Sequence, residues 1–213
     1  MIKYLILTNT IILLFNDFIY AQQTDFKSVT IGAQVWMSEN LSIKKFRNGD
    51  LIPYANTKEQ WEQAARNKTP AWCYFDDDSS TAIQHGILYN WYAVNDPRGL
   101  APQGWHIPSN AEWQKLFDFL GGMKLAGIKM KSKTGWTNDG NGTNESGFSA
   151  YASGRRNNES KYTCKNIWGI WWSANESSNE VAWTVGLVYV ANGVNLSDFH
   201  QKFEGLSVRC LKD

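Results

Sequence analysis

The clearest periodic pattern of apolar residues predicts a helix near the middle of the chain. Four apolar side chains recur at i, i+3, i+4 and i+7, on one face of a helix: Trp113, Leu116, Phe117 and Leu120. Ser109 precedes this run and Glu112 comes three residues after it, which is the pattern of a capping box. Gly121 and Gly122 are typical of a helix end. We expect the apolar face of this helix to lie in the core.

Two shorter patterns lie nearer the N-terminus. Residues 28–36 alternate around a Gly-Ala turn and predict a small β-hairpin. Thr57 and Gln60 form a second capping-box pattern, which predicts a short helix over 57–65. Residues 71–75 then predict a strand.

The second half of the chain changes to short runs of β-branched and aromatic residues. These runs predict strands at 147–153, 167–173, 181–191, 194–196 and 206–211. A long loop, residues 135–146, precedes them. Helices in the first half and antiparallel strands in the second favour an α+β fold with two or so helices and much irregular loop.

The first 21 residues have the composition of a cleavable secretory signal. Lys3 precedes an apolar stretch over 4–15, and the small residue Ala21 precedes the polar Gln22. A bilayer span needs about 20 apolar residues in a row, so an uncleaved membrane anchor is the weaker alternative. We predict a signal peptide over 1–21 and one domain over 22–213. No transmembrane segment is expected after the signal, and the location is secreted, periplasmic or cell-surface.

Charge and cysteine content narrow the range of partners. The 21 basic and 20 acidic residues give a net charge of +1, so we expect no nucleic-acid partner. An oxidising compartment permits one disulfide among Cys73, Cys164 and Cys210, and the residues leave its pairing open. No cysteine or histidine spacing is typical of structural zinc.

Tryptophan is the unusual feature of the composition, with 11 residues in the chain. Burial is the commoner fate of a single tryptophan, but an exposed ring beside amides is typical of a glycan or peptide site. Aromatic residues beside the Asn-rich loops of the second half are the candidate ligand-binding set: Trp136, Tyr151, Trp168, Trp171 and Trp183.

Two loops are rich in the oxygen ligands that calcium prefers. One holds Asp76, Asp77 and Asp78. The other is the better candidate because its glycines let carbonyl groups turn inward, and it holds Asn138, Asp139, Asn141, Asn144 and Glu145. Ordinary turns use the same residue types, so calcium and plain turn chemistry stay as alternatives.

Seven phrases in register resemble one known family, the Fibrobacter succinogenes major paralogous domain of exported and surface proteins. They are VTIGAQVWMSENL (29–41), PAWCYF (70–75), GILYNWYAV (86–94), PQGWHIPSNAEW (102–113), ESGFSAYASGR (145–155), WWSA (171–174) and LSVRCLKD (206–213). The resemblance covers essentially the whole mature chain. It implies a C-type-lectin-like fold, distantly similar to the formylglycine-generating, sulfatase-modifying proteins.

The resemblance also bears on the cysteines. Many members have a cysteine where this chain has Ala101, while the partner near the end, Cys210, is retained. Cys210 is therefore free or pairs with Cys164 or Cys73, and Cys164 with Cys210 is the candidate pair. The formylglycine-generating relatives use two thiols to bind copper, but the residues around these cysteines do not resemble that active site.

The sequence thus leads to three hypotheses for function. The favoured one is an exported, non-catalytic module that binds a glycan or a surface protein through a loop-rich aromatic face. The first alternative is an oxidase-like enzyme related to the formylglycine-generating fold. The second is a surface scaffold with no small ligand. An exposed aromatic ring beside amides in a groove would distinguish the favoured hypothesis from the scaffold.

Overall fold

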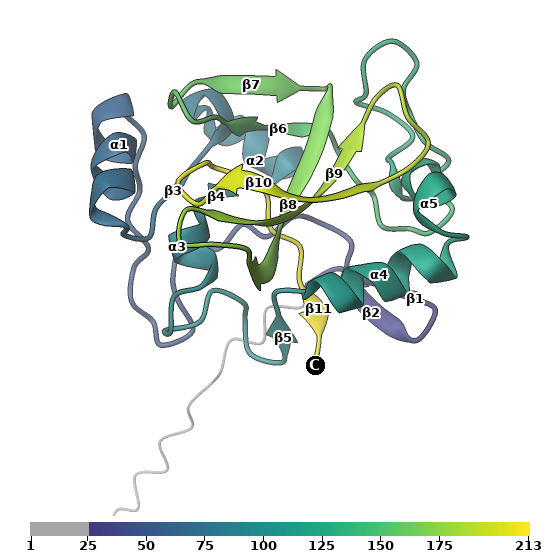
Figure 1. The fold of residues 1–213 in the computed structure, drawn as a ribbon, viewed down its shortest axis with the longest axis horizontal. Helices are drawn as coiled ribbons and strands as arrows, with labels where there is room; N and C mark the ends of the chain where they lie inside the picture. Colours follow the sequence, from purple (N-terminus) through teal and green to yellow (C-terminus); the bar gives the residue numbers. More distant parts are fainter. Residues whose placement is uncertain (1–25) are drawn as a thin grey trace, which may run out of the picture.

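The computed structural model describes residues 26–213, and the predicted signal peptide over 1–21 lies outside them. The predicted N-terminal hairpin is present as β1, Ser28–Ile31, and β2, Gln34–Met37. It extends into a four-stranded sheet of order β1-β2-β11-β5 with β5, Trp105–His106, and β11, Leu211–Lys212 (Figure 1). The first and last described segments therefore lie in the same sheet.

Both helices predicted from capping boxes are present. Helix α1, Lys58–Asn67, begins after Thr57, whose side chain accepts a hydrogen bond from the Gln60 backbone. Helix α4, Asn110–Phe119, begins after Ser109 in the same way with Glu112. Figure 1 shows α1 and α4 on opposite sides of the molecule.

The remaining helical elements are short. In the first half they are two 3-10 turns, η1, Phe75–Asp77, and η2, Ser79–Thr81, followed by α2, Ala82–His85, and α3, Trp91–Val94. Helix α5, Met123–Met130, follows α4 directly. The sequence pattern missed α5 because its apolar positions do not form a clear stripe and Gly122 offers no side-chain cap.

The second half of the chain forms a three-stranded antiparallel sheet of order β10-β9-β8, which we call the central sheet. Its strands are β8, Trp168–Glu176, β9, Val181–Val188, and β10, Asn195–Gln201. Two small antiparallel pairs complete the strands. One joins β3, Trp72–Cys73, to β4, Leu88–Tyr89, and the other joins β6, Ser153–Arg156, to β7, Tyr162–Lys165. The predicted α+β class is confirmed.

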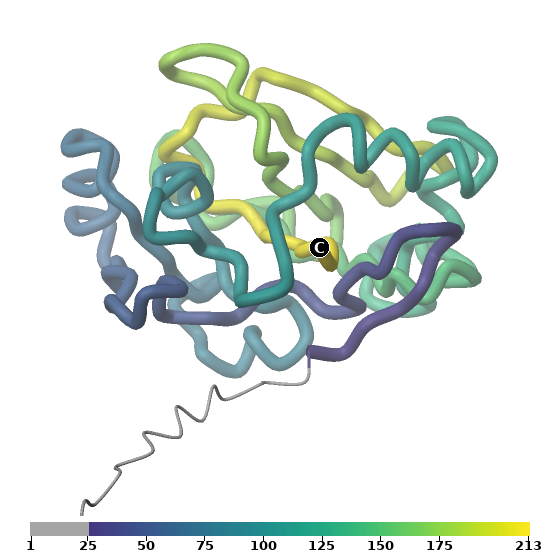
Figure 2. Tube along the Cα trace, turned by 90° about the horizontal axis from the view of Figure 1, so that it is seen from below, coloured from purple at the N-terminus to yellow at the C-terminus, as the bar shows by residue number. Residues whose placement is uncertain are grey.

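A buried segment, which we call the central thread (residues 205–211), connects all four sheets. Its residues form bridges in turn to Arg156 of β6, Tyr89 of β4, Trp171 of β8 and Trp36 of β2. Every residue of the thread is buried, and Figure 2 shows it running through the middle of the molecule. The predicted strand over 206–211 is thus an extended segment that pairs with a different sheet at almost every step.

One predicted strand is wrong. Residues 147–152 are irregular apart from a single bridge between Ala150 and Lys131. Gly147 and Ser149 have positive φ values of 72° and 55°, which interrupt the extended backbone that a strand needs. Phe148, between them, still reaches the core beside Trp36 and Trp171. The apolar residue in this alternation is therefore a core residue carried by an irregular segment, not by a strand.

A groove on the open face of the central sheet

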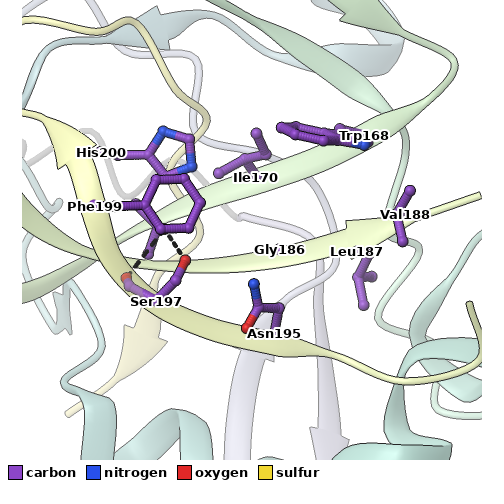
Figure 3. Close-up of a pocket in the computed structure, with 10 residues that line it drawn as sticks. Trp168, Ile170, Gly186, Leu187, Val188, Asn195, Ser197, Phe199 and His200 are labelled. Atoms are coloured by element: carbon purple, nitrogen blue, oxygen red, sulfur yellow. Dashed lines mark hydrogen bonds between the residues drawn. The ribbon is translucent and has the colours of Figure 1, made fainter.

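A mostly apolar groove lies over β8, β9 and β10, with a volume of about 160 Å3. Its walls are Trp168 on one side and Phe199 with His200 on the other, as Figure 3 shows. Ile170 lies on the floor between them and belongs to the core below. A concave, mostly apolar surface with a few polar groups is the usual form of a small-ligand site.

Strand alternation explains which residues face the groove. Ile170 pairs with Gly186, and Gly186 pairs with Asn195, so these three residues lie side by side on one face. Residues one step along the strands, such as Trp171 and Val185, point the other way and fill the core. Further along the groove face, Trp172 and Thr184 are completely buried, so this face is accessible only near the strand ends that carry Trp168 and Asn195. We call this accessible part the open face.

Gly186 is the reason that the open face is concave. A Cβ atom at this position would have only one heavy atom within 4 Å, the carbonyl oxygen of Asn195 at 4.0 Å. Its backbone is not in the left-handed region, so the strand itself does not require glycine. The missing side chain in the central strand leaves the space between Trp168 and Phe199.

Trp168 is held from one side by charged residues. The guanidinium carbon of Arg155 lies 5.4 Å from the centre of the Trp168 ring, within range of a cation–π interaction. Arg155 also donates to Glu204 at 3.0 Å, and this carboxylate is almost completely buried. The Arg155–Glu204 pair is neutral overall, so it orients Trp168 without giving the groove a net charge.

His200 presents one ring nitrogen to the groove. Its Nδ1 lies 3.1 Å from Glu204 and 3.3 Å from Arg155. Within residues 26–213 its Nε2 has no hydrogen-bond partner, and Figure 3 shows the ring at the groove wall. When Nδ1 donates to Glu204, Nε2 accepts, and when Nδ1 accepts from Arg155, Nε2 donates. Either polarity is available to a ligand hydroxyl.

Neutral polar groups form the rest of the groove. The hydroxyl of Thr184 lies 3.3 Å from the hydroxyl and from the carbonyl oxygen of Ser197. Asn195 is exposed at one end, and its amide makes no hydrogen bond within the described chain. The groove thus combines two aromatic walls with the exposed amide of Asn195, the hydroxyl of Ser197 and the edge of the nearly buried His200 imidazole, while Thr184 is completely buried beneath Ser197.

Comparison with known protein families identifies the chain as a whole. The model of the Fibrobacter succinogenes major domain matches residues 29–212. The chain belongs to the Fibrobacter succinogenes major domain family. No significant match to a curated protein or to a solved structure was found, so the C-type-lectin-like assignment stays a prediction.

Two of the five candidate aromatic residues of this Fibrobacter succinogenes major domain cannot present a ring to a ligand. Trp136 and Trp171 are buried, with 5 % and 0 % of their surface exposed. The Trp136 indole donates to the carbonyl oxygen of Ala150, and the Trp171 indole donates to Asn40. Their expected place on a ligand face is wrong, because the core requires both rings.

The other candidates do not form one set. Tyr151 is half-buried and packs against His85, away from the groove. Trp183 is half-buried on β9, but it alternates with Thr184 and so lies on the opposite face of the sheet from the groove. Trp168 is the one predicted aromatic residue that lines the groove.

The candidate calcium loop of the domain is held by its own hydrogen bonds. Asn141 accepts from the Trp136 backbone, and Asn144 accepts from the backbone of Ser149. Glu145 forms an ion pair with Lys129, while Asn138 and Asp139 are exposed at the turn. The described residues contain no cluster of three acidic, histidine or cysteine side chains that could hold a metal.

A buried ammonium group takes the place expected for a cation in this loop. Lys131 is 2 % exposed, and its Nζ donates to the carbonyl oxygens of Gly140 and Tyr189, both at 3.2 Å. The same group lies 5.0 Å from the centre of the Trp136 ring. The inward-facing carbonyl groups that suggested calcium therefore include one that binds a lysine.

The second acidic loop is also satisfied internally. Asp78 caps the turn η2 by accepting from Ser80, and Asp77 accepts from the hydroxyl of Tyr162. Its carboxylates therefore serve the fold in this structure.

The predicted disulfide between Cys164 and Cys210 is absent, and all three cysteines are free. Cys210 lies in the central thread and Cys73 in a separate small cluster under α1, while Cys164 is half-buried on β7. Burial raises the pKa of the Cys73 thiol to about 11 and that of Cys210 to about 12. Both are poor nucleophiles and poor metal ligands in this state.

Sequence reasoning did not place Arg155 beside the groove, and it did not select Asn195, Phe199 or His200 as ligand residues. The signal that could have found them is the alternation over 195–199, in which Asn195 and Ser197 share one face. A bulge between Ser197 and His200 then moves His200 toward the same side. A bulge of this kind has no clear sequence signature.

Proposed function

We propose that this domain is an exported, non-catalytic module that binds a neutral glycan in the groove over β8, β9 and β10. The observation that carries the proposal is the pairing of Trp168, fixed by Arg155, with a row of neutral hydrogen-bonding groups across a concave surface. Sugar rings offer an apolar face to an aromatic ring and hydroxyl groups to amides and imidazoles.

Neutrality of the groove favours an uncharged sugar over an acidic one. The charges near Trp168 belong to Arg155 and Glu204, which neutralise each other at 3.0 Å. A carboxylate or sulfate on the ligand would have no unpaired cation facing it at this point. The scaffold hypothesis, in contrast, gives no role to a groove with two aromatic walls.

The export part of the proposal rests on the composition of residues 1–21. No helix in residues 26–213 has the length and apolar character needed to cross a bilayer. The positions of the thiols argue against the oxidase alternative. The two buried thiols lie in different clusters, which does not suit a two-thiol copper site. Sequencing the protein recovered from outside the cytoplasm would test export, and we expect the first residue to be Gln22.

A glycan array that displays neutral and acidic polysaccharide fragments tests the ligand class. The full chain should bind one or more neutral fragments, and a chelator should not reduce the signal because no metal takes part. Binding only to acidic fragments, or to none, would overturn the proposal.

A further inference from the structure

A second neutral groove lies along α1, on a part of the molecule that the proposed function does not use. It has a volume of about 250 Å3 between the helix and residues 53–55 and 69–71. One wall is a stripe of the helix at i, i+3, i+4 and i+7: Gln60, Gln63, Ala64 and Asn67. Tyr54 forms the facing wall.

Tyr54 is an exposed ring on a rigid support. It is 40 % exposed, and it stacks on Trp72 with ring centres 4.4 Å apart and planes at 23°. Trp72 is buried and donates from its indole nitrogen to the carbonyl oxygen of Ile52 at 3.0 Å. Tyr54 is therefore presented in a fixed orientation, which lowers the entropy cost of binding.

The helix wall is fixed as well. Trp61 on the inner face of α1 is buried and donates to the carbonyl oxygen of Phe203 at 2.8 Å. The guanidinium of Arg156 lies 4.8 Å from the Trp61 ring and donates to the carbonyl oxygens of Ala55 and Thr57. These contacts tie both walls of the groove to the core.

Apart from Gln60, whose side chain caps α1, the polar side chains of this groove have no partner inside the described chain. The side chains of Gln63, Asn67 and Thr69 and the hydroxyl of Tyr54 make no hydrogen bond within residues 26–213. No charged side chain lines the groove. Each amide offers both a donor and an acceptor, which suits the adjacent hydroxyl groups of a sugar.

We infer that the α1 groove is a second site for a neutral glycan, stacked on Tyr54 and hydrogen-bonded by Gln63 and Asn67. A peptide strand fits less well, because the backbone on both sides of Tyr54 is already paired with Trp72 and so no free strand edge is present. This inference rests on the proposed function for its ligand class.

An NMR titration of the full chain with cellohexaose, mannohexaose and xylohexaose tests this inference. The side-chain amide signals of Gln63 and Asn67 report on the α1 groove, and the indole signal of Trp168 reports on the other. We expect one of the sugars to shift both sets. The double variant Gln63→Ala/Asn67→Ala should weaken binding at the α1 groove about tenfold or more, read from the backbone amide signal of the lining residue Ala64, and leave the Trp168 shift unchanged.

Matched variants separate the two sites. Arg66→Ala changes an exposed residue of α1 that does not line the groove, and it should leave both sets of shifts intact. Trp168→Ala should remove the first site and keep the shifts of Gln63 and Asn67. The second site alone would be overturned if the sugar shifted only the Trp168 signal of the wild type. It would also be overturned if the shifts of Gln63 and Asn67 disappeared in Trp168→Ala. The absence of any shift with all three sugars would overturn both proposals.

Discussion

Arg209 shows what a single charged residue does at the centre of this fold. It is completely buried, and its guanidinium donates to Asn40 and to the carbonyl oxygens of Met37 and Phe148. Burial lowers the pKa of Arg209 to about 9, so the group is still charged at neutral pH. The side chain joins the central thread to two segments that are far away in sequence, residues 37–40 and 148–149.

Replacement of Arg209 by methionine is expected to destabilise the protein strongly. Methionine fills similar volume but leaves several buried oxygen acceptors without a donor, at a cost of about 3 kcal/mol. Urea unfolding followed by tryptophan fluorescence measures this loss. Arg209→Lys keeps a charge but not the fork of donors, and it should recover only part of the stability. Equal stability of wild type and Arg209→Met would contradict this role.

Thiol reactivity tests the state of the cysteines. In the folded protein we expect Ellman's reagent to modify Cys164 first, because Cys73 and Cys210 are buried and burial raises the pKa of each thiol. All three should react after denaturation without a reductant. If only one thiol appeared in the denatured, unreduced protein, a disulfide would be present and the free state would be wrong.

At the scale of elements, a histidine links two parts of the fold. His106 in β5 lies 2.7 Å from Asp213 and 3.0 Å from Glu112, the capping residue of α4. Partial burial alone would lower the pKa of His106, but hydrogen bonds to the two carboxylates outweigh it and raise the pKa above 6.5. For Glu112, burial alone would raise the pKa, but hydrogen bonds with Ser109 and His106 outweigh it and lower the pKa below 4.5.

The stability that this link contributes should depend on pH with a definite sign. The raised pKa of His106 makes its contribution complete below about pH 6.5, and it is lost as the pH rises through the folded-state value. The contribution of Glu112 is present above about pH 4.5 and is lost as the pH falls through its folded-state value. The difference in unfolding free energy between wild type and His106→Gln should be largest between these limits. We expect at most about 1 kcal/mol, because both groups are partly exposed.

A measurement of unfolding free energy at several pH values checks this prediction. Lys27→Gln, which removes an exposed ion pair with Glu39, is a suitable control because it should not change the pH dependence near neutrality. A difference for His106→Gln that grows above neutral pH would contradict the assignment.

The loop over 135–146 should be stable without calcium. Lys131 satisfies loop carbonyl groups that would otherwise need a cation, and desolvation lowers its pKa without a carboxylate partner nearby. Millimolar calcium or a chelator should therefore leave the melting temperature unchanged, whereas Lys131→Met should cost about 2 kcal/mol. A rise in melting temperature with calcium would show that the loop binds the metal after all.

The elements that sequence could predict are those with a local cause. The capping boxes at Thr57 and Ser109 and the hairpin turn at Gly32 depend on residues a few positions apart. The irregular backbone at 147–149 and the role of Lys131 depend on distant partners. Alternation therefore predicted a strand that is absent, and composition suggested calcium where a lysine binds. The same reason explains why, of the candidate aromatic residues, only Trp168 lines the groove: burial of Trp136 and Trp171 is set by strands far away in the chain.

At the scale of the molecule, the buried thread is what holds two open surfaces in place. It bridges to β8 beside the first groove, and it continues from residues that contact Trp61 under the second. Neither groove carries an unpaired charge, each has an aromatic wall supported by neighbouring side chains, and each is floored by residues of a core cluster. Nine of the 11 tryptophans are buried in the core, and two are half-buried, of which Trp168 lines a groove.

The most direct test of the central claim is to fill the first groove without disturbing the fold. Gly186→Val adds a side chain where the nearest atom to its Cβ would be 4.0 Å away, and valine favours a strand. The variant should unfold at the same or a higher temperature than wild type.

The affinity of Gly186→Val at the first groove is the decisive measurement, read as the titration of the Trp168 indole signal with the neutral sugar that the wild type binds. Our account predicts that Gly186→Val loses at least about tenfold in affinity. The control Trp183→Ala, on the opposite face of the sheet, should bind the sugar with wild-type affinity. Wild-type affinity in a folded Gly186→Val protein would contradict the claim that this groove is the ligand site.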